Sequence, residues 1–264
     1  MYPERNRKDK TALITGAASG LGFAFADNLA KQGYNLLVVD IQEDKMYHVA
    51  KQFRSDYHVE VYVICLDLSR IDAAETVYAF CRKHRIDIHI LINNAGCLVF
   101  DAITAIDDDK YNAFLQLHLN TPAKLCKLFG GDMKARREGY MLIVSSLAAW
   151  MPYPYLSLYA STKQFLRTFA KSVHFEFSDC NVGVTVVCPG AVDTQLFDLK
   201  PKLRKIAKNI GVMITPDLLA QRSLKKMFHN RKSYIPGLIN KLSIPLIMLL
   251  PVRLLVFFYK KITL

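Results

Sequence analysis

The stretch from Thr11 to Gly22, TALITGAASGLG, decides the fold of this chain. A short apolar, β-like run at 12–15 leads directly into the glycines, and an Ala/Phe/Leu-rich helical pattern begins at Phe23. A strand, a glycine turn and a helix start in this order form an anion site, because free N–H groups and the positive helix end point toward a bound group such as a pyrophosphate. The glycines permit the tight turn and a close approach to the backbone. The loop alone leaves a plain glycine turn open, since such motifs recur by chance.

Five further apolar runs have the character of strands, and helix-length segments separate them. These runs cover residues 36–40, 59–66, 88–92, 140–145 and 182–187. Near-continuous apolar strands that alternate with helices indicate a parallel sheet covered on both faces, with right-handed crossovers. The sequence therefore predicts one doubly wound α/β domain.

The composition fits a folded domain and concentrates its charge in one region. Hydrophobic residues make up 52% of the 264 residues and charged residues 22%, which excludes a disordered chain, a collagen-like repeat and a coiled coil. The net charge is +12, yet residues 200–264 carry 14 Lys and Arg against a single acid, whereas residues 1–199 have a net charge of −1. The basic excess therefore belongs to the C-terminal quarter of the chain.

Cysteine usage and the N-terminus predict a cytoplasmic protein. None of the six cysteines forms a C-x-x-C pair and no His/Cys cluster has zinc spacing, so no metal site is expected. Small buried thiols in a reducing compartment fit this pattern. The first ten residues, MYPERNRKDK, are charged and lack the apolar core of a secretory signal peptide.

Asp40 ends the second strand-like run, 18 residues after Gly22. A carboxylate at that point can accept hydrogen bonds from both ribose hydroxyls of an adenosine and would repel a 2′-phosphate, so NAD is favoured over NADP. Its neighbours Ile41 and Gln42 supply no cation for such a phosphate. The alternative is that Asp40 only begins a turn. Asp67, which ends the third run, can likewise face the adenine or begin a helix as its cap.

Tyr159 and Lys163 are four residues apart, which places both on one face of a helix. A free tyrosine has a pKa of about 10, and a nearby ammonium lowers that value toward the range of a useful acid/base group. Ordinary Tyr/Lys helix pairs are common, so the surrounding residues decide the interpretation. Ser145 and Ser146 end an apolar strand, and the carboxyl end of a parallel strand is where ligands bind.

Together with other motifs, these residues resemble the short-chain dehydrogenase/reductase family in its single-domain branch. The motifs that carry the resemblance are T-G-x-x-x-G-x-G at Thr15 to Gly22, N-N-A-G at Asn93 to Gly96, Y-x-x-x-K at Tyr159 and Lys163, and P-G-x-V-x-T at Pro189 to Thr194. The resemblance covers about residues 9–236 and implies a Rossmann-type, mostly parallel seven-stranded sheet. Six strands are clear in the sequence, and Ser233–Pro236 is the candidate for the seventh. An amphipathic pattern at 216–229, with Thr215 as N-cap, precedes it.

The resemblance also implies the roles of individual residues. Tyr159 would be the general acid/base, Lys163 would lower its pKa and hold the nicotinamide ribose, and Ser146 would hydrogen-bond the substrate oxygen. Asn120 would help hold a water that relays protons through Lys163. The implied cofactor contacts are Gly16, Ser19, Gly20, Leu21, Gly22, Asp40, Ile41, Asp67, Leu68, Asn94, Ala95, Gly96, Tyr159, Lys163, Pro189, Gly190, Val192 and Thr194. His118 and His174 have no partner at recognisable spacing and are interpreted as core or surface histidines.

The C-terminal segment differs from the body, so we divide the chain into a catalytic domain, 1–236, and an apolar, basic tail, 237–264. Residues 242–259 would span about 27 Å as a helix, near the lower limit for a bilayer. Pro245, Pro251 and Arg253 interrupt that stretch. Association with a membrane surface fits better than a straight span, with basic residues on anionic headgroups. A tail packed in a subunit interface or over the substrate cleft is the alternative.

These observations predict an oxidoreductase that moves a hydride between a nicotinamide cofactor and a secondary alcohol or ketone of an apolar, lipid- or steroid-like substrate. An apolar flap supports this substrate class, because in the family the region that includes Phe197, Leu199, Ile206, Ile210, Val212 and Met213 covers the substrate. The alternatives are an NADPH-dependent reductase of 3-oxo lipids (3-oxoacyl or 3-ketosphinganine type) and a non-catalytic relative that senses the cofactor. A nucleic-acid binder is disfavoured, since the basic tail interleaves its charges with Leu, Ile and Val. The family is usually dimeric or tetrameric.

Overall fold

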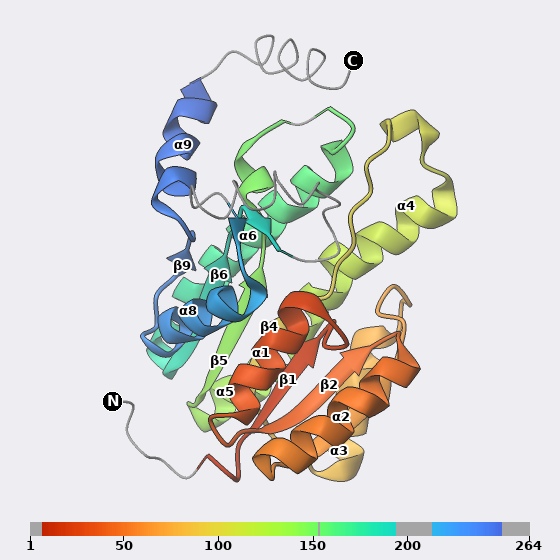
Figure 1. The fold of residues 1–264 in the computed structure, drawn as a ribbon, viewed down its shortest axis with the longest axis vertical. Coiled ribbons are helices and arrows are strands. Elements are labelled where there is room, and N and C mark those ends of the chain that lie inside the picture. The colour runs from red at the N-terminus through yellow and green to blue at the C-terminus, as the bar shows by residue number, and fades with distance from the viewer. Residues whose placement is uncertain (1–6, 153, 194–212, 250–264) are drawn as a thin grey trace.

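The protein is a seven-stranded parallel sheet between two layers of helices, as the computed structural model shows for residues 7–152, 154–193 and 213–249 (Figure 1). The strand order is β3-β2-β1-β4-β5-β6-β9, and every neighbouring pair is parallel. The strands are β1 (Thr11–Thr15), β2 (Asn35–Asp40), β3 (Val61–Cys65), β4 (Ile88–Asn93), β5 (Gly139–Val144), β6 (Val182–Val187) and β9 (Ser233–Tyr234). The doubly wound, Rossmann-type fold is thereby confirmed.

The seventh strand is where the sequence placed it, but it is short. Ser233 and Tyr234 pair with Val186 and Val187 at the edge of the sheet. The strand stops before Pro236, which has no N–H to donate to a ladder. The third strand is also shorter than expected: its run begins at residue 59, yet pairing with β2 covers only residues 61–65.

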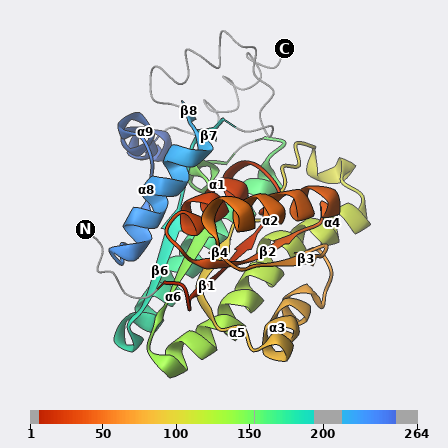
Figure 2. The same cartoon turned by 60° about the horizontal axis from the view of Figure 1, so that its bottom comes forward.

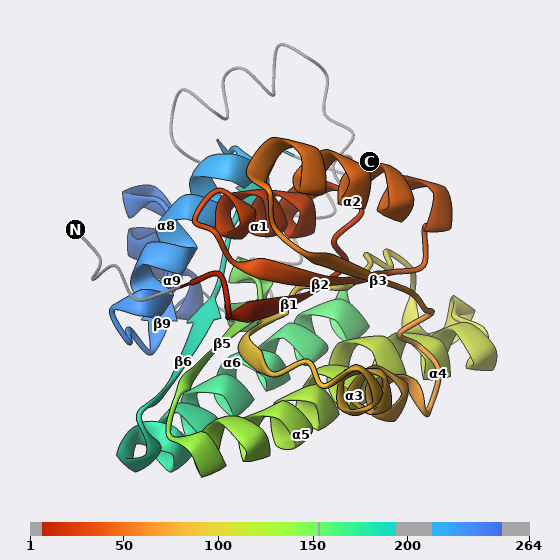
Figure 3. The same cartoon turned by 90° about the horizontal axis from the view of Figure 1, so that it is seen from below.

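Helices cover both faces of the sheet (Figure 3). On one face lie α1 (Gly20–Ala30), α2 (Glu43–Tyr57) and α8 (Pro216–Phe228); on the other lie α3 (Ala73–His84), α5 (Thr121–Arg136) and α6 (Ser157–Phe177). Side chains alternate along each strand, so that in β1 Ile14 packs under the first layer and Leu13 under the second. This burial on both faces explains why the strands are apolar runs without polar alternation.

The helix that leads to the last strand begins as expected. The Thr215 hydroxyl accepts a hydrogen bond from the Leu218 N–H at 3.4 Å, and Pro216 occupies the first helical position. The short parallel ribbon of β7 (Ala191–Val192) and β8 (Met213–Ile214) lies near the N-terminal end of this helix (Figure 2).

Two helices, α4 (Asp108–Leu115) and α9 (Leu238–Leu249), project from the carboxyl end of the sheet (Figure 1). Between α4 and α5 the helix continues through one turn of π-helix, Gln116–Asn120, which is called the π-turn below. Asn240 and Ile244 of α9 are buried, and the helix packs against the 3-10 turn Leu147–Trp150. In the part of the chain that the structure describes, no helix combines the length and apolar character needed to cross a membrane.

Candidate active site

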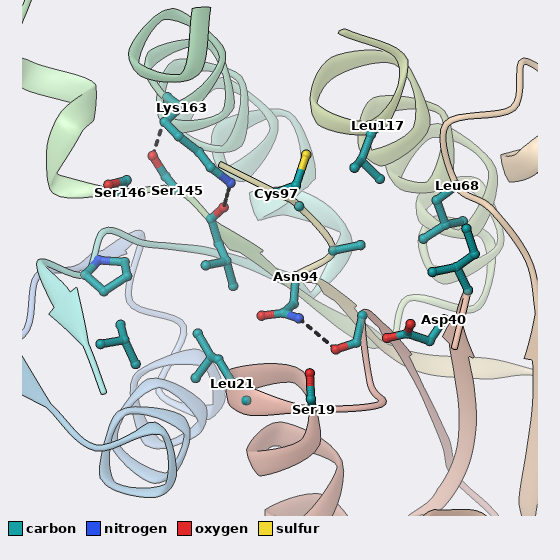
Figure 4. Close-up of a pocket in the computed structure, with 18 of the residues that line it drawn as sticks. Ser19, Leu21, Asp40, Leu68, Asn94, Cys97, Leu117, Ser145, Ser146 and Lys163 are labelled. Carbon is teal, nitrogen blue, oxygen red and sulfur yellow. Dashed lines mark hydrogen bonds between the residues drawn. The ribbon is translucent and has the colours of Figure 1, made fainter. Parts of the chain in front are cut away.

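A cavity of about 850 Å³ opens at the carboxyl ends of the strands, where the strand order reverses between β1 and β4 (Figure 4). This is the position at which ligands bind in open α/β sheets, because the loops of the two halves diverge there. The cavity is lined by Gly16, Ser19, Gly20, Leu21, Asp40, Ile41, Gln42, Leu66, Asp67, Leu68, Asn94, Ala95, Gly96, Cys97, Leu117, Val144, Ser145, Ser146, Tyr159, Lys163, Pro189, Gly190, Val192 and Asp193. Its volume lies in the range of cofactor and ligand sites.

The glycine loop lies at one end of the cavity, and the surrounding atoms leave no space for a side chain at Gly16 or Gly22. Gly16 has φ of +68° and Gly20 has φ of +56°, a backbone conformation that glycine adopts without strain. A Cβ on Gly22 would lie 1.9 Å from the Gly16 carbonyl oxygen, so the helix packs directly on the loop. Gly22 therefore supports the cavity from behind and does not line it.

The N-terminus of α1 is open toward this loop. Ser19 occupies the N-cap position, but its hydroxyl makes no capping bond, and no acid lies in the first turn. The first N–H groups of the helix and its positive end therefore remain available to an anion. The residues present fit the pyrophosphate of a dinucleotide.

Asn94 and Thr15 hold the glycine loop in place. The Asn94 amide donates to the carbonyls of Thr15 (2.9 Å) and Gly16 (3.3 Å). In return, the Thr15 hydroxyl accepts the backbone N–H groups of Asn94 and Ala95, both at 3.0 Å. These bonds join the ends of β1 and β4 across the point where the strand order reverses, so the N-N-A-G motif builds the cavity as well as lining it.

Asp40 is buried at the end of β2 and lines the cavity. One carboxylate oxygen accepts the Ala18 N–H at 3.0 Å, and the other accepts the Gln42 N–H at 3.1 Å. Asp40 thus begins a turn and also faces the ligand space, so the two interpretations of this residue do not exclude each other.

Asp67 lines the same region of the cavity, but the helix-cap interpretation is wrong. Its carboxylate accepts the backbone N–H of Ser69 at 2.8 Å and the Ser69 hydroxyl at 2.7 Å. That pattern is a local turn, and α3 starts only at Ala73.

Tyr159 and Lys163 meet at the opposite end of the cavity, on the first turns of α6. The Lys163 ammonium lies 5.6 Å from the centre of the Tyr159 ring. Its Nζ donates to the Val144 carbonyl at 3.2 Å, while the Ser145 hydroxyl donates to the Lys163 carbonyl at 2.7 Å (Figure 4). Lys163 is buried, and α6 is therefore anchored to the end of β5 by two hydrogen bonds.

The electrostatics of this pair differ from the expectation. Burial raises the pKa of Tyr159, and a hydrogen bond with Ser146 opposes that effect. Burial also lowers the pKa of Lys163 to about 8. Without cofactor, burial outweighs the hydrogen bond with Ser146, so the pKa of Tyr159 is raised and not lowered as the spacing predicts.

Ser146 lies at the carboxyl end of β5, close to the tyrosine. Its Oγ accepts the Ala148 N–H at 3.1 Å and caps the 3-10 turn Leu147–Trp150. This hydrogen bond fixes the position of the serine side chain. Because Oγ is the acceptor in it, the serine O–H remains free to donate. Ser146, Tyr159 and Lys163 are thus gathered at one wall of the cavity.

Of the predicted residues, Asn120 does not line the cavity and Thr194 is not described. The Asn120 side chain is exposed, donates to the Gln116 amide oxygen at 2.9 Å and does not line the cavity. The proton-relay role of Asn120 stays a prediction. Thr194, together with most of the expected flap, lies outside the described residues; of the flap only Met213 is described, and it is buried in β8.

The sequence interpretation missed several lining residues. Gln42, Leu66, Cys97, Leu117, Val144, Ser145 and Asp193 line the cavity without belonging to the predicted set. Most of these residues are sequence neighbours of predicted ones, which could have indicated that they line the cavity. No sequence feature indicated Leu117. His118 is a core histidine, as expected, and its Nε2 accepts the Cys97 N–H at 3.1 Å, a partner that the sequence spacing did not indicate.

Known proteins share both the sequence pattern and the fold. The family model described as short chain dehydrogenase matches residues 10–204. The very-long-chain 3-oxoacyl-CoA reductase-A of Danio rerio is 30% identical over 203 residues, which cover 74% of this chain and 62% of that protein. The chain thus spans less than two thirds of the length of this curated relative.

Two solved structures superpose over most of the chain. A structure from work on the stereoselectivity of a 7beta-hydroxysteroid dehydrogenase has a TM-score of 0.82 and 26% identity, and the match covers 89% of this chain and 90% of that one. The L-sorbose reductase of Gluconobacter frateurii, complexed with NADPH and L-sorbose, has a TM-score of 0.79 and 25% identity, and covers 86% of this chain and 95% of its own. With a family model that matches most of its length and a cavity built from the motifs of that family, this chain belongs to the short chain dehydrogenase family.

Proposed function

We propose that this protein is a nicotinamide-dependent oxidoreductase that interconverts a secondary alcohol and a ketone on an apolar substrate. The observation that carries the proposal is the layout of one cavity, with the glycine loop and Asp40 at one end and Ser146, Tyr159 and Lys163 at the other. A dinucleotide bound along it would bring its reactive ring to the tyrosine.

Each residue at the reacting end has a distinct task. Hydride transfer is the chemistry that the nicotinamide supplies when it is bound. Tyr159 gives its hydroxyl proton to the carbonyl oxygen in reduction and takes a proton from the alcohol in oxidation. Ser146 donates a hydrogen bond to the same oxygen while negative charge develops there. Lys163, held at the Val144 carbonyl, keeps a positive charge beside the tyrosine.

NAD is the proposed cofactor, and NADP is the alternative. The buried Asp40 carboxylate faces the cavity, and its neighbours Ile41 and Gln42 bring no positive charge to receive a 2′-phosphate. The structural relative with bound NADPH supports a nicotinamide cofactor in general and does not choose between the two.

An apolar substrate is proposed from the surroundings of Tyr159. The tyrosine packs in a small apolar cluster with Val99, Phe114 and Leu158. Just beyond it, Phe100 and Tyr155 stack at 6.0 Å and are about half exposed. The names of the relatives, a very-long-chain 3-oxoacyl-CoA reductase and a 7beta-hydroxysteroid dehydrogenase, support lipid or steroid substrates.

The first experiment measures binding of NADH and NADPH to wild type, Asp40→Ala and Asp40→Asn. We expect wild type to prefer NADH and both variants to lose that preference, because each removes the charge that repels the 2′-phosphate. Asp40→Asn is the matched control, since its amide oxygen can still accept the Ala18 N–H that holds the loop. Equal or tighter binding of NADPH to wild type would overturn the NAD assignment and favour the 3-oxo lipid reductase.

The second experiment tests catalysis with a 17-oxosteroid and a long-chain 3-oxoacyl thioester as probes. Tyr159→Phe should lower kcat by roughly 10²- to 10⁴-fold while NADH binding is retained, because only the transferred proton is lost. Wild type that binds NADH and oxidises it with neither probe would favour the non-catalytic cofactor sensor.

Membrane-surface association is proposed for the C-terminal segment, with α9 as the contact. Asn240 and Ile244 face the body, whereas Leu238, Leu242 and Leu249 are 64% to 82% exposed. After Asp217 the chain contains no further acid. An exposed apolar face among basic residues is typical of helices that bind anionic bilayers. The alternative is a tail packed in a subunit interface.

Vesicle sedimentation distinguishes these two. Wild type should bind phosphatidylglycerol vesicles more strongly than phosphatidylcholine vesicles, and Leu242→Gln should weaken both. Binding to neither, combined with a smaller oligomer in Leu242→Gln, would support the subunit interface. We further propose a cytoplasmic homodimer or homotetramer, peripheral on the cytoplasmic face of a membrane; the exposed Phe165 and Phe175 of α6 support self-association, which light scattering would measure.

A further inference from the structure

His118 is a buried histidine next to the reacting residues, and it lies outside the four motifs that carry the family resemblance. It lies in the π-turn between α4 and α5, and only 1% of its surface is exposed. One face of the ring stacks on Phe114 at 4.1 Å, and its edge meets the Tyr159 ring at 6.1 Å. π-turns inside helices are rare and often occur at functional sites.

The two ring nitrogens of His118 bridge the cofactor loop and the catalytic helix. Nε2 accepts the Cys97 N–H at 3.1 Å, directly after the N-A-G segment that lines the cavity. Nδ1 lies 3.5 Å from the Thr162 hydroxyl, which itself donates to the Tyr159 carbonyl at 2.8 Å. Because Nε2 accepts and the threonine hydroxyl already spends its proton, a neutral ring must carry its hydrogen on Nδ1.

This chain of hydrogen bonds runs in one direction from Cys97 through His118 and Thr162 to Tyr159. Among the described residues, it links the loop after β4 to the turn of α6 that carries the tyrosine. Gly96 completes the contact, since a Cβ there would lie 3.1 Å from the His118 ring and 3.6 Å from the Lys163 ammonium. The three groups are therefore packed without room for a side chain between them.

The charges around the ring keep it neutral. The titratable groups that face it are Cys97 from the loop and Tyr159 and Lys163 from α6. Burial is the main reason why the pKa of His118 lies well below its ordinary range, and the positive charge of Lys163 lowers it further. A protonated ring would lose the bond from Cys97 and would repel the ammonium.

We propose that His118 is a positioning residue for the reaction: as the neutral Nδ1–H tautomer, it fixes Tyr159 relative to Lys163 and to the end of the cofactor loop. The inference rests on the proposed function for its consequence in catalysis. Its geometric part, the tautomer and the coupling to the tyrosine, can be measured without any substrate.

The experiment compares wild type with His118→Gln and His118→Leu. A glutamine amide carries an acceptor and a donor at nearly the separation of the two ring nitrogens, so it can remake both bonds and cannot take up a proton. Leucine fills similar space and makes neither bond. Thr162→Ser and Thr162→Val form a second matched pair, which keeps or removes the hydroxyl at the next position of the chain.

Two spectroscopic readouts use only the NADH complex. Long-range ¹H–¹⁵N correlation spectra, assigned by the signal missing in His118→Gln, should show a neutral ring with its hydrogen on Nδ1. Tyrosine labelled with ¹³C at Cζ, assigned with Tyr159→Phe, reports the pKa of Tyr159. That pKa should rise in His118→Leu and Thr162→Val, because the tyrosine moves away from the ammonium, and should return in His118→Gln and Thr162→Ser.

Steady-state kinetics supply the third readout, with a probe ketone that wild type reduces. His118→Leu should lower kcat by roughly ten- to a hundredfold with a small change in the KM for NADH, as expected for a misplaced acid/base group. His118→Gln should recover most of that loss. A merely structural role would lower the amount of folded protein without moving the pKa of Tyr159.

Either of two results overturns the inference: a ring that is cationic or carries its hydrogen on Nε2 at neutral pH, or a Tyr159 pKa that is equal in wild type and His118→Leu. If wild type reduces no probe ketone, the proposed function fails on that ground alone. The two spectroscopic readouts still decide the role of His118 in that case.

Discussion

Replacing Lys163 by methionine should stabilise the cofactor-free protein while abolishing its activity. The lysine is buried, and burial lowers its pKa from 10.5 to about 8. That difference corresponds to about 3 kcal/mol by which the folded state disfavours the ammonium at neutral pH. Loss of the hydrogen bond to the Val144 carbonyl offsets about 1 kcal/mol of the gain. We therefore expect the free energy of unfolding of Lys163→Met to exceed that of wild type by about 2 kcal/mol at pH 7.

The pH dependence of that difference has a defined sign. Below pH 8 the lysine is charged in both the folded and unfolded states, so the cost of burying the ammonium is fully present. Between pH 8 and 10.5 the folded state has released its proton while the unfolded state still binds one, so wild-type stability rises with pH. The advantage of Lys163→Met should shrink by about 2 kcal/mol by a pH of about 9.5.

Urea unfolding without cofactor, followed by circular dichroism at the two pH values, measures both quantities. Lys127→Met is the matched control, because Lys127 is exposed on α5 and its replacement should change stability by less than about 0.5 kcal/mol at either pH. A variant that is no more stable than wild type at pH 7, or an advantage that does not depend on pH, would refute the reasoning. Either result would mean that Lys163 is solvated in the free protein.

Three further predictions concern the loop, a helix cap and the thiols. Gly22→Ala should abolish NADH binding in calorimetric titration, because the added Cβ would overlap the neighbouring backbone. Gly131→Ala is the matched control: it lies in a helix, and its added Cβ meets no atom within 4 Å. It should raise the free energy of unfolding by about 0.5–1 kcal/mol in urea unfolding. Thr215→Ala should lower the free energy of unfolding by about 1 kcal/mol through loss of the helix cap, measured in the same unfolding assay, with unchanged stability as the contradicting outcome. A thiol reagent should modify the exposed Cys65 and Cys97, and saturating NADH should slow only Cys97, which lines the cavity; equal protection of both in peptide mass mapping would contradict that placement.

Local signals in the sequence were sufficient for the architecture and for both ends of the cavity. Apolar runs at regular spacing predict the parallel strands, since burial on both faces removes polar alternation. The glycine loop and Asp40 indicate one end of the cavity. The four-residue spacing places Tyr159 and Lys163 on one face of a helix, and the resemblance to the family implies that this face forms the other end. In the structure Gly16, Gly20, Asp40, Tyr159 and Lys163 line one cavity.

The tertiary structure alone decided which side chain of the next helix reaches the reacting residues. The sequence places Asn120 and His118 in one helical run, and residues two apart point to nearly opposite sides of a helix, so the run does not say which of them faces the site. In the structure both residues lie in the π-turn Gln116–Asn120, with His118 buried beside Tyr159 and the Asn120 side chain exposed. Sequence periodicity assumes a regular helix, so it carries no signal for an inserted turn of this kind.

The protonation of the site was likewise decided by the fold. The spacing of Tyr159 and Lys163 predicts a lowered tyrosine pKa, yet burial in the folded chain raises it. Residue types and spacings determine which groups can meet, because these depend on local geometry. Desolvation depends on every element packed around those groups, which is why only the tertiary structure sets the charge that each of them carries.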